Sequence, residues 1–368
     1  MQTAWALIAL LLLAACGQPE ATLTAKPITA DPVLPTPTST IEITPSREPE
    51  SAEERSDGLT ADQAATLASL VKVDDHPLYT MRYVGKYELA AGHRGPDRGT
   101  AGGEFVFPAA APWACSLFAT QEIYGRNFDW QHSPALLLFT DPPEGLASVS
   151  MVDIAYLGFE PEELDRLTEL ELAARIKLLS APRLPFDGMN EAGLVVGMAA
   201  VPPGEMVPDP AKETIGSLGV IRQILDRARD VDGAVAILRS YNVEFGGGPP
   251  IHYLVAEPGG RSALVEFYQG EIVVIPNPEP WHLATNFLRA SAGDSAEGRC
   301  HRYDTIAQRL TDAEGKLSIQ HGMDLLADVS QTNTEWSVIY QMRTGEVLVT
   351  MGREYTNLQT FQLKLAGL

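Results

Sequence analysis

The sequence predicts an α+β fold in which antiparallel sheets pack against helices. Three observations favour it: segments rich in β-branched and aromatic residues cluster along the chain, helical segments cluster separately, and strict strand–helix alternation is missing. The chain has 368 residues, 45% of them hydrophobic, which is enough for one large domain or two small ones with a sizeable core. A wholly disordered chain is thereby excluded.

The folded elements are expected to begin near residue 58. A helix over 60–72, with Thr60 or Asp62 as its N-cap, precedes a strand over 79–88. Further helices are expected at 161–179, 217–229, 231–241, 301–310 and 319–327. Further strands are expected at 115–119, 123–129, 135–140, 149–155, 193–200, 251–256, 262–267, 271–275, 281–287, 336–341, 346–351 and 360–365.

The N-terminus predicts export. An apolar run over residues 5–13 is followed by Ala14, Ala15 and Cys16, and this pattern resembles the lipobox of a bacterial lipoprotein signal, in which Cys16 is lipidated. The run is too short to span a membrane as a helix. We expect residues 1–16 to be the signal peptide and the protein to be anchored to the outer face of the cell membrane. A plain secretory signal and an N-terminal membrane anchor are the alternatives.

Residues 17–57 are expected to form a disordered tether between the membrane and the folded body. The segment is rich in Pro and Thr, carries an excess of acidic residues and has few large apolar side chains. The whole chain has 48 acidic and 27 basic side chains, which gives a formal net charge of −21. This balance argues against a nucleic-acid partner, because a polyanion requires a basic surface.

Other chemistries have little support. Three cysteines make neither a disulfide framework nor a zinc ribbon, and clustered His/Cys spacing is missing, so neither a metal nor a cofactor is expected. A Ser/His/Asp hydrolase is disfavoured because the sequence has no Gly-x-Ser-x-Gly elbow. We interpret His252, in a predicted strand, as a core histidine with satisfied hydrogen bonds.

The segment from Cys115 to Trp130 carries the chemistry. Cys115 opens one predicted strand, and the next strand ends in Gly-Arg-Asn-Phe-Asp-Trp, so a hairpin returns Arg126 and Asp129 toward Cys115. A nearby guanidinium favours the thiolate, and a carboxylate can orient an α-amino group. If the Ala114–Cys115 bond is cut, the amine of Cys115, with a pKa of about 8, suits proton transfer near neutral pH.

Ordered motifs carry a family resemblance over residues 58–368. They are Cys115, GRNFDW, the FDGMNEAGL stretch, ATNF, His-Arg-Tyr and Trp-Ser, in that order along the chain. The sequence thereby resembles linear amide C–N hydrolases of the N-terminal nucleophile superfamily, the group of choloylglycine hydrolase, acid ceramidase and acyl-CoA:6-aminopenicillanic acid acyltransferase. The resemblance implies an αββα sandwich of two antiparallel sheets between helix layers.

The resemblance also implies roles for individual residues. Cys115 matches the nucleophile, whose α-amine serves as general base and acid. Arg126 matches the arginine near the thiolate, and Asp129 the carboxylate that holds the amine. Asn286 matches the amide donor to the oxyanion or to the amine. The late arginine of the site is matched by Arg302, with Arg299 as the alternative register.

Two departures from the family pattern stand out. Bile-salt hydrolases carry a second oxyanion-hole Asn ten residues beyond the position of Asn190, which we expect to be a supporting, substrate-side residue. Here that position is Ala200, which argues against a true bile-salt hydrolase. The second departure is the 114 residues ahead of Cys115. We therefore expect self-cleavage before Cys115, with 58–114 kept as a small subunit beside the catalytic body, 115–368.

The resulting expectation is a hydrolase of linear amides other than peptide bonds. A small N-acyl amide with an apolar acyl group is the expected substrate, and Phe139, Tyr156 and Met198 are candidates for the walls of the acyl pocket. An acyltransferase that uses the same acyl-enzyme is one alternative. A surface lipoprotein that binds an acyl ligand without turnover is the other.

Overall fold

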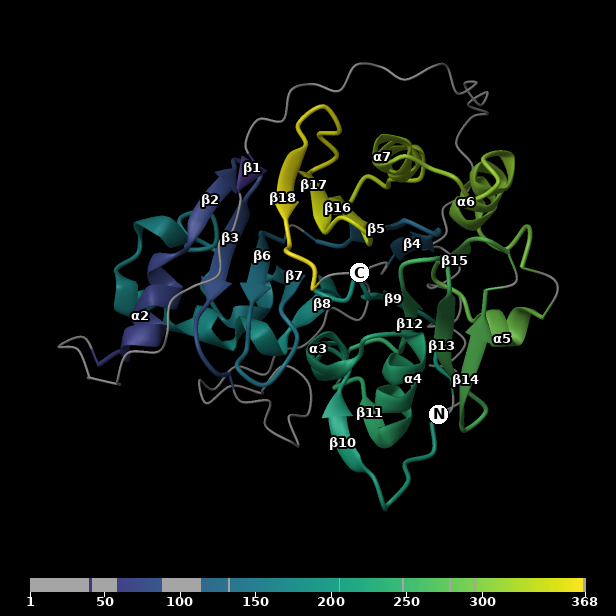
Figure 1. The fold of residues 1–368 in the computed structure, drawn as a ribbon, viewed down its shortest axis with the longest axis horizontal. Coiled ribbons are helices and arrows are strands. Elements are labelled where there is room, and N and C mark those ends of the chain that lie inside the picture. The colour runs from purple at the N-terminus through teal and green to yellow at the C-terminus, as the bar shows by residue number, and fades with distance from the viewer. Residues whose placement is uncertain are drawn as a thin grey trace, which may run out of the picture.

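Two large sheets lie face to face, with helices on both outer sides (Figure 1). This αββα sandwich confirms the predicted fold class. Among the described residues, no helix is long and apolar enough to cross a membrane. The predicted signal segment lies outside the described residues, as does the predicted tether apart from Thr40–Ile41. The computed structural model describes residues 40–41, 58–87, 114–131, 133–204, 206–246, 248–277, 279–293 and 296–366.

The first sheet carries Cys115. Its strands, in spatial order, are β1 (Thr40–Ile41), β18 (Gln359–Gln362), β17 (Glu346–Met351), β16 (Thr334–Gln341), β5 (Ile123–Asp129), β4 (Ala114–Ala119) and β15 (His282–Ala284). All neighbours in it are antiparallel except β1 and β18. Helices α6 (His301–Asp312) and α7 (Ile319–Asp328) cover its outer face, and the short α5 (Arg289–Ala292) follows β15.

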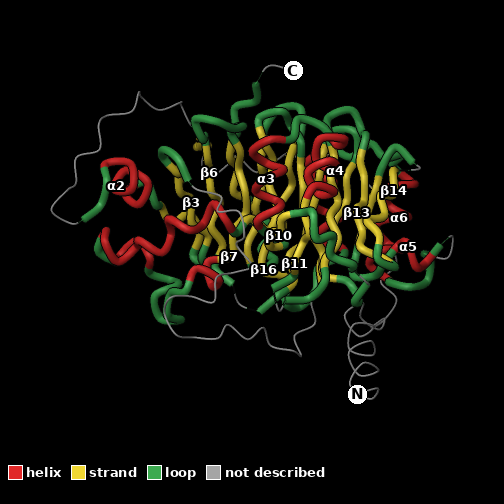
Figure 2. Tube along the Cα trace, turned by 90° about the horizontal axis from the view of Figure 1, so that it is seen from below, coloured by secondary structure: helices red, strands yellow, loops and turns green. Residues whose placement is uncertain are grey.

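The second sheet is larger. Its spatial order is β14 (Glu271–Pro276), β13 (Ser262–Tyr268), β12 (Ile251–Ala256), β9 (Val195–Ala200), β8 (Pro185–Asn190), β7 (Ser148–Asp153), β6 (Ala135–Thr140), β3 (Leu78–Tyr83) and β2 (Val71–Asp74). Helices α3 (Gly219–Arg227) and α4 (Val231–Ser240) lie across its outer face, as Figure 2 shows. A small parallel pair, β10 (Glu213–Gly216) and β11 (Tyr241–Glu244), lies beside them.

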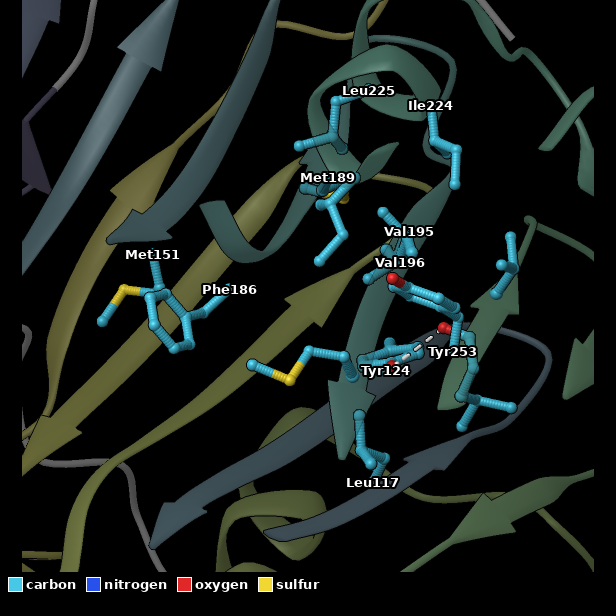
Figure 3. Close-up of a cluster of buried hydrophobic side chains, with 14 of the residues drawn as sticks. Leu117, Tyr124, Met151, Phe186, Met189, Val195, Val196, Ile224, Leu225 and Tyr253 are labelled. Carbon is cyan, nitrogen blue, oxygen red and sulfur yellow. Dashed lines mark hydrogen bonds between the residues drawn. The ribbon is translucent and has the colours of Figure 1, made fainter. Parts of the chain in front are cut away.

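Large side chains fill the space between the sheets. Figure 3 shows Leu117 and Tyr124 of the first sheet near Val195 and Val196 of the second. Leu117 and Tyr124 reach the backbone of Gly197, because a Cβ there would lie 2.6 Å from Tyr124 Oη and 3.0 Å from Leu117 Cδ2. A larger residue at Gly197 would push the two sheets apart. Each fully buried Leu or Val contributes about 1.5–3 kcal/mol to stability.

The segment upstream of Cys115 is part of the second sheet. Helix α2 (Ala61–Ala68) begins at Thr60, which forms a capping box with Gln63. Strand β3 pairs in parallel with β6 over six residues, and Leu67 and Tyr79 are fully buried. The helix predicted over 60–72 ends early, because Val71 starts β2, a strand that the sequence analysis missed.

The helix predicted over 161–179 is wrong. Two 3-10 helices occupy this region, η2 (Leu167–Glu169) and η3 (Leu172–Arg183). Another 3-10 helix, η1 (Ile154–Leu157), follows β7. Strand β8 was also missed, because it begins with Pro185 and contains Gly188, two weak strand formers.

Candidate active site

Cys115 lies near the start of β4, paired in register with Phe128 of β5. Its side chain is 1% exposed and belongs to the core between the sheets. The chain is continuous here, so the Cys115 nitrogen is a peptide N–H that stands in for the α-amine of a cleaved chain. It donates a hydrogen bond of 3.0 Å to Asn286 Oδ1.

Arg126 reaches the thiol as the predicted hairpin requires. One terminal nitrogen, Nη2, lies 3.7 Å from Cys115 Sγ. The other, Nη1, donates to the carbonyl oxygen of Phe186 at 2.7 Å and forms an ion pair with the Asp187 carboxylate. The guanidinium is fully buried. Residues of β8 therefore bind Nη1 of Arg126, while its Nη2 faces the sulfur of Cys115.

Asp187 is the site residue that the sequence analysis missed. Its buried carboxylate also accepts a hydrogen bond from the hydroxyl of Tyr340 in β16. Burial raises the pKa of Asp187, and the charge of Arg126 opposes this shift. A signal was present, since Asp187 lies inside the FDGMNEAGL stretch beside Asn190.

Burial dominates the state of the thiol. It raises the pKa of Cys115, whereas the charge of Arg126 lowers it and the charge of Asp129 raises it. The expected effect of the guanidinium is thus present, but desolvation outweighs it in the uncut chain. A buried Cys115 is mostly a thiol at neutral pH.

Arg302, at the start of α6, binds three groups around Cys115. Its Nη1 donates to the carbonyl oxygen of Cys115 at 2.7 Å and to Ser116 Oγ at 2.8 Å. Its Nη2 donates to Asn286 Oδ1 at 2.7 Å. Arg299, the alternative register, is exposed. The structure therefore brings Arg302 to the site.

Asn286 accepts hydrogen bonds through Oδ1, while its Nδ2 donates to the carbonyl oxygen of Ala200 at 2.8 Å. The Ala200 carbonyl thus orients the amide so that Oδ1 faces the Cys115 nitrogen. Sequence analysis treated Asn286 as a donor to the oxyanion or to the amine. In the uncut chain it is an acceptor from the nitrogen, with one Nδ2 hydrogen committed to Ala200.

Asp129 supports this arrangement from the end of β5. Its buried carboxylate accepts hydrogen bonds from Gln331 Nε2 at 2.8 Å and from the hydroxyl of Thr334, and it lies 3.7 Å from Arg302 Nη1. Burial raises its pKa, and the charge of Arg302 opposes that shift. The Cys115 N–H donates to Asn286 instead of this carboxylate, so Asp129 is linked to the Cys115 backbone only through Arg302, which binds the Cys115 carbonyl oxygen.

Two of the predicted substrate-binding residues do not face the site. Asn190 donates from Nδ2 to the carbonyls of Leu225 and Ala228, and its Oδ1 accepts from two backbone N–H groups, at Ala192 and Leu194. These four bonds use the whole amide, so Asn190 fixes the β8–β9 turn to the end of α3. In this structure it is a structural residue that does not face Cys115, and its substrate-side role stays a prediction.

Met198 also lies away from Cys115, and its place in an acyl pocket stays a prediction. It pairs with Tyr253 of β12, whose hydroxyl donates to the Ser217 carbonyl just ahead of α3. Neighbouring Gly197 faces the other sheet, and successive strand residues point to opposite faces. Met198 therefore lies on the face of β9 that α3 covers, away from Cys115.

Phe139 and Tyr156 are buried, in β6 and η1. The Tyr156 ring lies 5.4 Å from the ring of Phe186, the residue whose carbonyl anchors Arg126. Tyr156 is thus connected to the site through Phe186. Within the described part of the chain, no group of three or more His, Cys, Asp or Glu side chains is arranged to hold a metal ion.

Part of the chain is similar to a known protein family. Residues 179–354, just under half of the chain, match the family model described as acyl-coenzyme A:6-aminopenicillanic acid acyl-transferase. This range includes Asp187, Asn286 and Arg302 and begins after Cys115. No curated protein sequence matches the chain significantly.

Two solved structures are similar at low identity. Penicillin V acylase from Agrobacterium tumefaciens aligns with a TM-score of 0.42 and 12% identity, covering 65% of this chain and 82% of that one. A mutant of conjugated bile acid hydrolase from Clostridium perfringens aligns with a TM-score of 0.43 and 13% identity, covering 68% and 98%. The family match covers less than half of the chain and gives what this chain is similar to, whereas the αββα sandwich is the fold of the chain itself.

Proposed function

We propose that the protein hydrolyses N-acyl amides through Cys115, after cleavage of the Ala114–Cys115 bond. The match to the acyl-transferase family model supports chemistry at an amide C–N bond. One observation carries the finer proposal: the nitrogen, carbonyl oxygen and sulfur of Cys115 are each contacted by a different buried side chain. These are Asn286, Arg302 and Arg126. A structural cysteine needs no such set of contacts.

The proposed reaction uses the two ends of Cys115. The freed α-amine takes the thiol proton, and the thiolate, stabilised by Arg126, attacks the amide carbonyl. The second Nδ2 hydrogen of Asn286 and a backbone N–H stabilise the oxyanion. The backbone N–H takes the place of the side-chain donor that Ala200 lacks. The protonated amine then gives its proton to the leaving nitrogen. Water attacks the thioester, releasing the acid and restoring the thiol.

We also propose that the upstream segment stays bound after cleavage. Strand β3 supplies one edge of the parallel pair with β6, and Leu67 and Tyr79 are buried against the body. His76 adds a contact of 3.5 Å to Glu335, which lies in β16, the strand paired with β5. Losing the segment would expose the edge of β6 and an apolar cluster, which is unfavourable.

The N-terminal pattern favours a reaction outside the cell. We propose that Cys16 carries a lipid and that the predicted tether, 17–57, holds the enzyme at the outer face of the membrane. An apolar acyl amide is the proposed substrate, since such molecules partition to membranes.

Acyl transfer is the second candidate, and the match to an acyltransferase family model favours it. In this case an amine replaces water in the last step and a new amide forms. Incubating the enzyme with an N-acyl amide and a second amine distinguishes the two. New amide indicates transfer, whereas free acid alone indicates hydrolysis.

The test of the main proposal is intact mass and N-terminal sequencing of residues 58–368, followed by a screen of N-acyl amides. We expect a new N-terminus at Cys115 and an upstream fragment that co-purifies. Cys115→Ala should stay uncut and inactive, whereas Cys300→Ala, at the other described cysteine, should be cut and active. An uncut wild-type chain would refute the mechanism, and ligand binding without turnover would indicate a binding protein.

A further inference from the structure

Glu266, in β13, is a fully buried carboxylate outside the contacts described so far. Its Oε1 accepts from His252 Nδ1 and from the backbone N–H of Arg289, both at 2.9 Å. Its Oε2 accepts from the backbone N–H of Ala290 at 2.7 Å. A buried charge is costly unless it is fully hydrogen-bonded, and these three bonds meet that requirement.

The bound segment is the one that carries Asn286. Strand β15 ends at Ala284, so ladder hydrogen bonds to β4 stop two residues before Asn286. Glu266 binds this segment further on, because it accepts hydrogen bonds from the backbone N–H groups of Arg289 and Ala290, three and four residues beyond Asn286. The side chain that binds the Cys115 nitrogen therefore lies between a strand end on one side and the Glu266 carboxylate on the other.

The same segment also contacts the helix of Arg302. Arg289 Nη1 donates to the hydroxyl of Tyr303 at 2.7 Å, and its guanidinium lies 5.4 Å from the centre of the Tyr303 ring. The ring of Phe287 packs against that ring as well, at 5.1 Å. Tyr303 follows Arg302 directly in α6. One carboxylate is thus connected to both side chains that hydrogen-bond to the backbone of Cys115, Asn286 at its nitrogen and Arg302 at its carbonyl oxygen.

His252 completes the cluster. Its partner oxygen belongs to a carboxylate, so the proton of this bond lies on Nδ1 of the imidazole. Burial by itself raises the pKa of Glu266, but the bond from His252 and the two backbone N–H groups hold it below its usual range. Glu266 is therefore an anion at neutral pH.

We propose that Glu266 is a positioning residue for the active site, which fixes Asn286 and, through Arg289 and Tyr303, Arg302 relative to the nitrogen of Cys115. The proposal rests on the proposed function. It names a residue on the opposite sheet from Cys115 that never touches the reacting atoms.

Glu266→Gln tests it in the self-cleaved enzyme. The amide keeps one acceptor oxygen, but its NH2 group faces a donor N–H, so the 286–290 segment must shift. Misplacement of about 1 Å can cost roughly 100-fold in rate, so we expect kcat to fall by about 10- to 100-fold with KM nearly unchanged. The Arg302 cation disfavours a protonated amine on Cys115. As Arg302 relaxes, the acid limb of the kcat/KM profile should move to higher pH.

Two further variants make the test specific. Glu271→Gln, at an exposed carboxylate one strand away in the same hairpin, should leave kcat and the pH profile unchanged. Tyr303→Phe removes one hydroxyl at a partly exposed position, so it should fold even if Glu266→Gln does not. It should shift the acid limb in the same direction by a smaller amount.

The outcomes separate this proposal from the proposed function. If wild type is active and Cys115→Ala is not, the function stands. An unchanged pH profile and kcat in both Glu266→Gln and Tyr303→Phe would then overturn the positioning role alone. A rise in KM with unchanged kcat would also overturn it, because that change indicates altered substrate binding.

Discussion

The ion pair between Arg126 and Asp187 predicts a large stability effect from a small change, Asp187→Asn. Both side chains are 0% exposed, so the variant leaves the Arg126 charge buried without its counter-ion. Removing one partner of such a pair costs about 3–5 kcal/mol. We expect the lower end of this range, because the amide oxygen that the substitution introduces can still accept from Tyr340.

Urea unfolding followed by far-UV circular dichroism measures the loss. The matched control is Asp232→Asn, which breaks a similar Asp–Arg contact, with Arg261, at an exposed position. Exposed pairs contribute little, so the control should unfold like the wild type. If the two variants lose the same stability, burial is not the source of the effect and the reasoning about Arg126 is wrong.

Three further predictions concern stability and pH. Leu67→Ala opens a cavity in the fully buried upstream cluster and should lower the free energy of unfolding by about 2–5 kcal/mol. After cleavage, this variant should release the upstream fragment in size-exclusion chromatography. The surface change Val71→Thr should not release it. Burial lowers the pKa of His282 to about 4, below the unfolded value of 6.5, so its contribution to stability is lost as pH falls from 6.5 toward 4. His282→Gln should flatten urea midpoints over that window, and an unchanged slope would contradict the assignment. Burial raises the pKa of Asp153 to about 7, so this carboxyl favours the folded state at low pH and that contribution is lost as pH rises from about 4 to 7. Asp153→Asn should therefore gain stability relative to wild type above pH 7, and a constant difference across the range would refute this.

The sequence predicted those parts of the site that lie close together in the chain. Cys115, Arg126 and Asp129 share one hairpin, whose register follows from two short strands and a tight turn. Arg302 needed the resemblance, because 187 residues separate it from Cys115. Asp187 was missed for the same reason, since only the packing of β8 against β5 shows that its carboxylate meets Arg126.

The faces of strands were harder to predict than the strands. Met198 and Asn190 lie in or beside predicted elements, yet both turn away from Cys115. Strands buried on both faces have no polar–apolar alternation from which to read a direction. The choice depends on which helix covers which sheet, and for β9 that information lies in α3, a segment that follows it by about twenty residues.

The contacts around Cys115 suit both the uncut and the cut chain. Asn286 Oδ1 accepts from a peptide N–H and would accept equally from an α-amine, and Arg302 binds the Cys115 carbonyl, which cleavage does not touch. The proposed cleavage would change solvation, because it would place a new amine and a new carboxyl end next to a thiol whose pKa burial raises. Water that reached Sγ would relieve the desolvation that disfavours the thiolate and leave the charge of Arg126 to favour it. Thiol alkylation by iodoacetamide should therefore be slow in an uncut Ala114→Pro variant and fast in the cleaved enzyme, and equal rates would refute this coupling.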